Sequence, residues 1–325
     1  MASFPRPRRL RATPALRDLV AETVVRPQQL VLPLFVKEGI STPVPIASMP
    51  GVVQHTVDSL VREVDEALAV GVRTVILFGV TDERDEDGSL ACRADFVLER
   101  AIAALVARFA TDVTVVADLC LDEYTTHGHC GVLDAAGRVD NDATLVRYQA
   151  LAVALASAGV HFVGPSGMMD HQVAAIREAL DAHGFDDVGI LAYAAKYASA
   201  LYGPFRDAVE VEIAGGGDRA SYQQDPRNRR EAWREVDLDV AEGADLVMVK
   251  PASFYLDVLS DVAERSPVPV LAYQVSGEYS MIVAASANGW LDRRLAVLES
   301  LVAIRRAGAD GILTYFAKEA APWLR

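Results

Sequence analysis

Cysteine is scarce in this chain of 325 residues. The only cysteines are Cys92, Cys120 and Cys130, which are too few and too odd in number for the disulfide framework of a secreted scaffold. We therefore expect these thiols either to be free or to bind a metal ion.

The chain also lacks a long hydrophobic run. Apolar stretches such as 101–106 are bounded by Arg100 and Arg108, well short of the roughly 20 residues that a membrane-spanning helix needs. The first thirty residues are basic and contain Pro5, Pro7 and Pro14, but they hold no continuous apolar core before a cleavage site, so no secretory signal is recognised. We expect a cytoplasmic protein without a membrane segment.

Positive charge is in deficit. The formal net charge of -14 would repel both nucleic acid and an anionic membrane surface, so the expected partners are small molecules. One local exception is the basic cluster Arg6, Arg8, Arg9 and Arg11. This cluster could be a nucleic-acid-binding arm, but we interpret it as a solvated or subunit-contacting arm.

Hydrophobic residues make up 51% of the chain, enough for a large core. Between the strand-like runs lie stretches with apolar residues at helical spacing, such as Leu60, Val64 and Leu68, which predict amphipathic helices. Short runs rich in Val, Ile and Leu predict eight strands, at 30–35, 74–78, 113–121, 161–163, 188–193, 245–249, 268–275 and 311–316.

Strands that are apolar throughout and alternate with helices indicate a parallel sheet covered by helices. Eight such units fit a closed (β/α)8 TIM barrel better than an open doubly wound sheet, and no Gly-x-Gly-x-x-Gly follows an early strand. The prediction is an α/β protein with one catalytic barrel over 30–325 and an N-terminal arm over 1–29.

Two lysines stand where predicted barrel strands end, which is where barrel enzymes place their active sites. Lys196 follows the fifth apolar run and Lys250 the sixth. An apolar setting and a second ammonium group both lower the pKa of a lysine. Either lysine alone could be an ion-pair partner or a phosphate anchor, but the pair indicates Schiff-base chemistry on a carbonyl substrate. This pattern does not separate an aldolase from a dehydratase.

A possible metal site follows the third predicted strand. Residues two apart on a strand point the same way, so Cys120 and Asp122 can share a ligand while Cys130 folds back over them. Two thiolates favour zinc. The alternative is a pair of buried, inert cysteines.

The segment 203–223 contains three consecutive glycines at 215–217 and is predicted to be a mobile lid rather than a phosphate cradle. Arg206 and Arg219 flank the glycines and could hold a substrate carboxylate with bidentate geometry, although arginines in such a loop are more often solvated. Gln223 adds hydrogen-bonding capacity.

Three motifs around the predicted strand ends are long and specific. They are Ala195-Lys196-Tyr-Ala-Ser-Ala-Leu-Tyr202-Gly-Pro-Phe-Arg206-Asp, Val-Met-Val-Lys250-Pro and Leu-Ala-Tyr273-Gln-Val-Ser276-Gly-Glu. With these motifs the chain resembles the porphobilinogen synthase family, also called 5-aminolevulinate dehydratase, over nearly its whole length. The resemblance implies a (β/α)8 barrel that joins two molecules of 5-aminolevulinate into the pyrrole porphobilinogen and releases water, a step of tetrapyrrole (heme) biosynthesis.

The resemblance also implies a role for each residue of the site. Lys250 would form a Schiff base with the substrate that becomes the propionate side, and Lys196 would hold the acetate-side substrate. The implied substrate-binding residues are Arg206, Arg219 and Gln223 for the acetate-side carboxylate, Ser276 and Tyr315 for the propionate-side carboxylate, Asp118 and Ser166 for the amino group, and Tyr273 beside them. Another class I Schiff-base aldolase and a catalytically silent homologue are the alternatives.

The metal cluster departs from both forms of this family. The zinc type has cysteines at the positions of Cys120, Asp122 and Cys130, whereas the magnesium-dependent type has carboxylates or small residues there. We expect zinc, with Asp122 weakening or retuning the site. Glu235 matches a carboxylate that some members use for an allosteric magnesium between subunits, although it could be an ordinary exposed helix residue.

Two further positions depart from the family pattern, because Gly167 and His171 stand where many members carry Asp and Gly. The family also implies a homo-octamer whose N-terminal arms wrap neighbouring barrels.

Overall fold

The structure, a computed structural model, describes residues 5–93, 95–214 and 217–324. Its centre is a closed barrel in which each strand pairs in parallel with the next and the last pairs with the first, so the predicted TIM barrel is confirmed. The barrel strands are β1 (Leu30–Lys37), β4 (Thr74–Val80), β5 (Thr114–Leu119), β6 (Phe162–Pro165), β7 (Gly189–Lys196), β8 (Leu246–Lys250), β9 (Val270–Gln274) and β10 (Gly311–Thr314).

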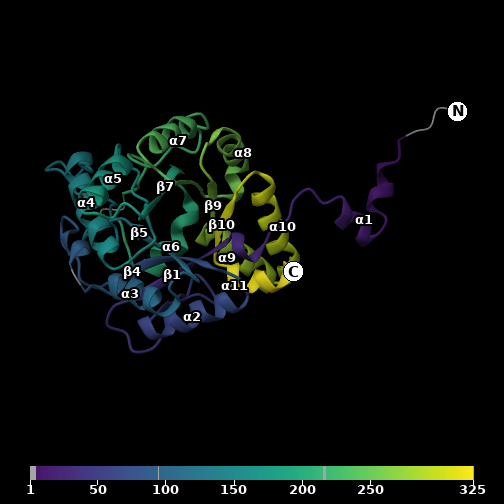
Figure 1. Cartoon of the computed structure of the whole chain (residues 1–325), viewed down its shortest axis with the longest axis horizontal. Coiled ribbons are helices and arrows are strands. Elements are labelled where there is room, and N and C mark those ends of the chain that lie inside the picture. The colour runs from purple at the N-terminus through teal and green to yellow at the C-terminus, as the bar shows by residue number, and fades with distance from the viewer. Residues whose placement is uncertain (1–4, 94, 215–216, 325) are drawn as a thin grey trace.

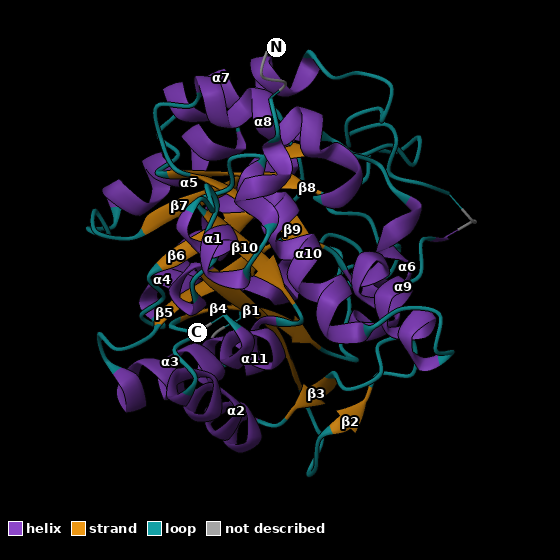
Figure 2. Ribbon diagram, turned by 90° about the vertical axis from the view of Figure 1, so that its right-hand side faces the viewer, coloured by secondary structure: helices purple, strands orange, loops and turns teal. Residues whose placement is uncertain are grey.

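Helices surround these strands (Figure 2). Their apolar faces cover the outside of the barrel, as in α2, where Leu60, Val64 and Ala67 are buried and Thr56 caps the first turn by accepting a hydrogen bond from the Ser59 amide. The helices are α2 (Val57–Ala69), α3 (Val97–Phe109), α4 (Asn141–Ser157), α5 (Gln172–Ala182), α6 (Gly203–Val209), α7 (Glu231–Ala241), α8 (Leu256–Arg265), α9 (Ser276–Ala287), α10 (Arg293–Arg306) and α11 (Ala317–Ala320). Short 3-10 turns are η3 (Ser89–Cys92), η4 (Ala200–Tyr202), η6 (Ser253–Tyr255) and η7 (Ala321–Trp323).

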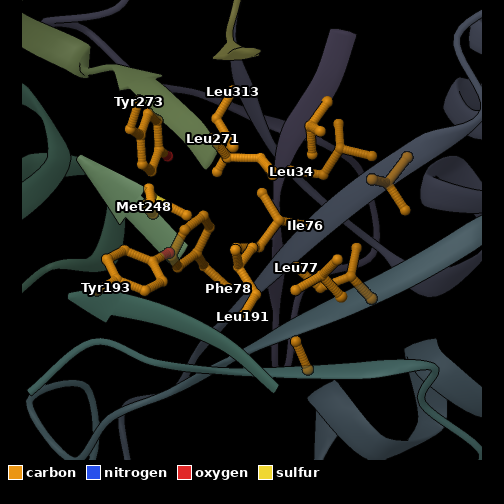
Figure 3. Packing of buried hydrophobic residues seen from close by; sticks show 14 of the residues in the cluster. Leu34, Ile76, Leu77, Phe78, Leu191, Tyr193, Met248, Leu271, Tyr273 and Leu313 are labelled. Carbon is orange, nitrogen blue, oxygen red and sulfur yellow. The ribbon is translucent and has the colours of Figure 1, made fainter. Parts of the chain in front are cut away.

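The core is continuous through the barrel. Figure 3 shows apolar side chains from β1, β4, β7, β8, β9 and β10 packed into one cluster, among them Leu34, Ile76, Leu191, Met248 and Leu271. Because both faces of these strands are buried, the strands are apolar throughout, which is why the sequence marks them so clearly.

A small antiparallel pair of strands, β2 (Val44–Pro45) and β3 (Val53–His55), was not predicted. Strands of two and three residues are too short to show a period in the sequence. The pair bears on the site, because β3 joins the end of β1 and its Gln54 donates hydrogen bonds to the Ala208 carbonyl (2.9 Å) and to Glu210 (3.0 Å) at the end of α6.

The N-terminal segment extends away from the barrel (Figure 1). It contains η1 (Pro7–Arg11), α1 (Pro14–Leu19) and η2 (Pro27–Gln29), and no residue of the three is buried. Its apolar side chains Leu10, Leu19 and Val24 are exposed. Contact of this arm with another subunit stays a prediction. Among the described residues, no helix is both long and apolar enough to cross a membrane.

Candidate active site

Lys196 and Lys250 lie side by side at the C-terminal ends of adjacent strands. They are partners in the β7–β8 register, and they are only 4% and 5% exposed. Neither lysine has a carboxylate within ion-pairing distance among the described residues. The pairing predicted from the two apolar runs is therefore present, and two amines share one buried site.

The Lys250 ammonium nitrogen is surrounded by aromatic rings. It lies 4.6 Å from the ring centroid of Tyr273, 5.0 Å from Tyr193 and 5.3 Å from both Tyr202 and Phe205. The ring faces favour the cation, but burial disfavours it, and the charge of Lys196 adds repulsion. The net result lowers the pKa of Lys250 to about 7, so a large fraction of this amine is neutral and nucleophilic at physiological pH.

Lys196 is tied to residues of the two preceding strands. Its amine donates a hydrogen bond to the carbonyl of Ser166, just after β6, and the Ser166 hydroxyl donates to Asp118 of β5 over 3.2 Å. Burial and the nearby charge of Asp122 raise the pKa of Asp118 to about 6. Asp118 Oδ1 has no hydrogen-bond partner among the described residues and is free to meet a ligand.

Two tyrosines and a serine lie at or just after the ends of β9 and β10. Tyr273 Oη is 3.0 Å from Tyr315 Oη, and Ser276 at the start of α9 donates to the Leu201 carbonyl over 3.3 Å. Tyr273 is the member of this group whose ring lies against Lys250, and Tyr315 adjoins it. Substrate binding by these residues stays a prediction.

The segment that follows β7 covers the mouth of the barrel. Phe205 of α6 packs against Phe78 and Phe35 at ring-centroid distances of 5.0 and 5.8 Å. Arg206 is partly exposed on the same helix, and Gln223 is buried with its Nε2 unpartnered among the described residues. Gly215 and Gly216 of the predicted lid lie outside the described residues.

Cys120, Asp122 and Cys130 come together as predicted. One ligand atom from each lies within 4.8 Å of the other two, and all three residues are buried. Two sulfurs and one carboxylate oxygen in this arrangement could hold a metal ion. Burial raises the pKa of the Cys120 thiol, whereas the pKa of Cys130 is lowered because a hydrogen bond from Cys120 and the charge of Arg219 outweigh its burial.

Arg219 does not lie free on the lid, where the sequence had placed it as a carboxylate clamp. Arg219 is 8% exposed, and its guanidinium group donates to Asp122 (2.7 Å), to the Gly128 carbonyl (2.9 Å) and to Cys130 Sγ (3.2 Å). This cation holds the pKa of Asp122 well below its usual range, even though burial opposes the shift. Arg219 is thus part of the metal cluster in this structure.

Glu123 is a site residue that the sequence analysis missed. It is buried, and it forms a second possible ligand group with Asp118 and Cys120. Burial and the charges of Asp122 and Asp118 raise its pKa well above the ordinary value. Its place directly after Asp122 was the only signal available in the sequence.

Glu278 was also missed. This buried carboxylate accepts hydrogen bonds from the Ser253 amide (2.6 Å), the Val275 amide (2.6 Å) and the Ala252 amide (3.4 Å). It thereby joins the loop after Lys250 to the start of α9, where Ser276 lies. Glu278 thus fixes two segments next to the lysine site, the loop after β8 and the start of α9, without being part of that site.

Glu235 lies on α7 and belongs to neither group of possible metal ligands around Cys120. It shares a cavity of about 720 Å³ with Asp170, Gln223 and Glu231. Burial and the charges of Asp170 and Glu231 raise its pKa. In the described part of the chain, the groups of three ligands close enough to hold an ion are those around Cys120, so magnesium at Glu235 stays a prediction.

The two departures at 167 and 171 differ in how they fit their surroundings. A Cβ at Gly167 would overlap the hydroxyl of Tyr148, which donates to the Cys130 carbonyl over 2.7 Å. His171 has a left-handed backbone (φ +63°), which favours glycine, and its Nδ1 lies 3.0 Å from Glu242 Oε1. Gly167 is therefore coupled to the metal cluster through Tyr148.

Gly167→Ala is expected to destabilise the fold by about 1–3 kcal/mol, because the new methyl group displaces the buried Tyr148. The same displacement should weaken metal binding, since Tyr148 supports Cys130. Thermal unfolding and a metal titration measure the two effects. Gly203→Ala is the matched control, because no atom lies within 4 Å of its Cβ position. Equal melting temperatures for the two variants would contradict the prediction.

The fold and the site together define a class: a (β/α)8 barrel with two buried amines at its strand ends and a group of side chains beside them that could hold a metal ion. The family model of delta-aminolevulinic acid dehydratase matches residues 4–323. A Mycobacterium tuberculosis protein of that name is 60% identical, with 100% of this chain and 99% of the relative aligned. A Streptomyces coelicolor protein of the same name is 58% identical over 99% of this chain and 98% of the relative.

A solved structure gives the same result. The Toxoplasma gondii delta-aminolevulinic acid dehydratase (porphobilinogen synthase), in complex with the reaction product porphobilinogen, superposes with a TM-score of 0.96 at 47% identity. The alignment covers 99% of this chain and 92% of that one. The chain belongs to the delta-aminolevulinic acid dehydratase family. It is a hydro-lyase that forms porphobilinogen, as the sequence motifs predicted.

Proposed function

We propose that the enzyme condenses two molecules of 5-aminolevulinate through Schiff bases on Lys250 and Lys196. The observation that carries this proposal is the register pairing of the two buried amines at the mouth of the barrel. Each substrate molecule has one ketone, and each ketone needs one amine to form a Schiff base, so two substrates bound together need two amines. Lys250 would hold the propionate-side molecule and Lys196 the acetate-side molecule.

Lysine chemistry accounts for the bonds that must form. An amine that attacks a ketone releases one water molecule and leaves an imine, which is a better electrophile than the ketone and whose neighbouring carbon loses a proton more readily. One carbon–carbon bond and one carbon–nitrogen bond then join the substrates, and both lysines leave as free amines. The atom balance is two molecules of 5-aminolevulinate to one porphobilinogen and two waters.

The polar groups around the lysines can orient the two substrates. Ser276 and Tyr315, next to Lys250, would bind the propionate-side carboxylate. Arg206, Arg219 and Gln223 would bind the acetate-side carboxylate, with Asp118 and Ser166 near the amino group. Fixing both carboxylates holds the reacting carbons in one orientation, which removes much of the entropic cost of a reaction between two molecules.

Cys120, Asp122 and Cys130 would hold a zinc ion. The ion would act as a Lewis acid next to the acetate-side substrate. Two buried sulfurs favour zinc over magnesium, because magnesium prefers oxygen ligands. An allosteric magnesium at Glu235, an octameric assembly with N-terminal arms and a cytoplasmic location complete the proposal.

Incubation with 5-aminolevulinate, followed by a colorimetric assay for porphobilinogen, tests the activity. Reduction with borohydride during turnover and mass spectrometry of the peptides test the chemistry. We expect the substrate mass on the peptide that contains Lys250. A protein that makes the pyrrole without any label on this lysine would contradict the covalent mechanism while leaving the activity intact.

Removal of the metal is expected to abolish activity. Treatment with a strong chelator should reduce porphobilinogen formation to the background level, and zinc should restore it better than magnesium, because sulfur ligands retain the softer ion. The measurement is the activity regained per added equivalent of each metal. Restoration by magnesium alone would overturn the zinc assignment.

A further inference from the structure

The guanidinium group of Arg219 occupies the same ligands that would hold the metal. It binds Asp122 Oδ2 at 2.7 Å and Cys130 Sγ at 3.2 Å, two of the three ligand atoms of the cluster. Its charge faces the buried carboxylate of Asp122 and the buried sulfur of Cys130. In this state a side chain of the protein itself occupies two of the three metal-ligand atoms.

A metal ion and this guanidinium group exclude one another. Zinc would lie about 2.0–2.3 Å from the same oxygen and sulfur, which places a doubly charged ion within a few ångströms of the arginine. Both cations would use the same oxygen and sulfur, and little solvent is present to take the place of either one, because Arg219, Asp122 and Cys130 are all buried. Binding of the metal therefore requires that Arg219 leave.

The surroundings of Arg219 allow this movement without disruption of the fold. Its backbone carbonyl accepts hydrogen bonds from the Gln223 amide (2.9 Å) and the Tyr222 amide (3.2 Å), so the turn that carries it is fixed. In contrast, its Nε is buried without a hydrogen-bond partner among the described residues. Rotation of the side chain alone would therefore move the guanidinium group. In its present position the group does not have all of its donors hydrogen-bonded, because Nε is unpaired among the described residues.

We propose that Arg219 and the metal compete for Asp122 and Cys130, so that metal binding releases Arg219 to bind the acetate-side carboxylate of the substrate. This inference rests on the proposed function for the identity of that carboxylate. It makes Arg219 a positioning residue that links two binding events. Because such linkage is reciprocal, the substrate carboxylate must in turn tighten metal binding by drawing Arg219 away from the ligands.

The test measures zinc affinity in the full-length protein without substrate, by competition with a chelating dye. Arg219→Gln removes the competing cation and is expected to bind zinc at least about tenfold more tightly than the wild type. Arg206→Gln is the matched control, since Arg206 lies on the same lid but contacts neither Asp122 nor Cys130 in the described part of the chain. Its zinc affinity should equal that of the wild type.

A second measurement uses 4-oxopentanoate, a keto acid that lacks the amino group of the substrate. Only the probe bound at the acetate side is counted, as the labelled fraction of the Lys196 peptide after borohydride reduction. In the wild type, zinc should tighten this binding, and in Arg219→Gln the binding should be weaker and independent of zinc. Arg219→Lys retains a charge but only a single donor group, and it should bind zinc with intermediate affinity. Equal or weaker zinc affinity in both Arg219 variants would overturn the inference. Since no turnover is involved, that outcome leaves the lysine mechanism untouched.

Discussion

Lys250→Met is expected to abolish porphobilinogen formation and at the same time to stabilise the folded protein. Activity should fall by more than about 10⁴-fold, the order of loss seen when the nucleophile of a covalent mechanism is removed. Labelling by borohydride at this position should disappear. The assay and the trapping experiment described above measure both losses.

The gain in stability follows from the cost of burying an amine. The pKa of Lys250 falls from 10.5 to about 7 on folding, so the unfolded chain binds more protons between these two values. The cost is complete below pH 7, on the order of 5 kcal/mol, and disappears as the pH rises toward 10.5. Methionine has a similar length and no charge. The variant should therefore have a higher melting temperature at pH 6.5, and this advantage should shrink at pH 10.

Lys318→Met provides the control for this stability change. Lys318 lies on the surface with Glu63 at 2.6 Å and Glu66 at 2.9 Å, and these ion pairs raise its pKa despite partial burial. Its contribution is present below its unfolded pKa, so its removal should cost about 1 kcal/mol or less at neutral pH. The two lysine variants are thus expected to shift the melting temperature in opposite directions. A destabilised Lys250→Met would contradict the burial argument.

The barrel could be predicted from the sequence because its strands are buried on both faces. Each of the eight predicted runs overlaps an observed strand, although the runs at 113–121 and 268–275 extend beyond the strands, which end at Leu119 and Gln274. Apolar residues that continue past a strand belong to the buried loops of the barrel mouth. Composition alone does not distinguish the end of a strand from such a buried loop. The strands β2 and β3 were missed for another reason, because two or three residues are too few to show a periodic pattern of apolar residues.

The site could be predicted where it depends on strand ends, and not where it depends on loops. Lys196 and Lys250 are the last residues of β7 and β8, and Cys120 and Asp122 follow within three residues of the end of β5, so the barrel dictates their arrangement. Arg219 contacts Asp122 across 97 positions of the chain, and only the folded path of the lid determines that contact. Glu278 was missed for a similar reason, because its partners are backbone amides, which leave no pattern in the sequence.

Lys196→Met is expected to abolish porphobilinogen formation as well, but through a different physical signature. Without Lys196 the second ketone has no amine, so the pyrrole cannot form, whereas Lys250 should still be labelled by 4-oxopentanoate and borohydride. The charge of Lys196 is one of the causes that lower the pKa of Lys250, after burial. Its removal should therefore move the pH dependence of labelling to higher pH.

Lys196→Arg separates charge from chemistry. Arginine retains the positive charge at this position but does not form a Schiff base at neutral pH. We expect this variant to make no porphobilinogen, yet to label Lys250 with the midpoint of the wild type. The measurement is the labelled fraction of the Lys250 peptide as a function of pH for all three proteins. A common midpoint for the methionine variant and the wild type would mean that burial alone tunes Lys250, and that the second lysine acts only as a nucleophile.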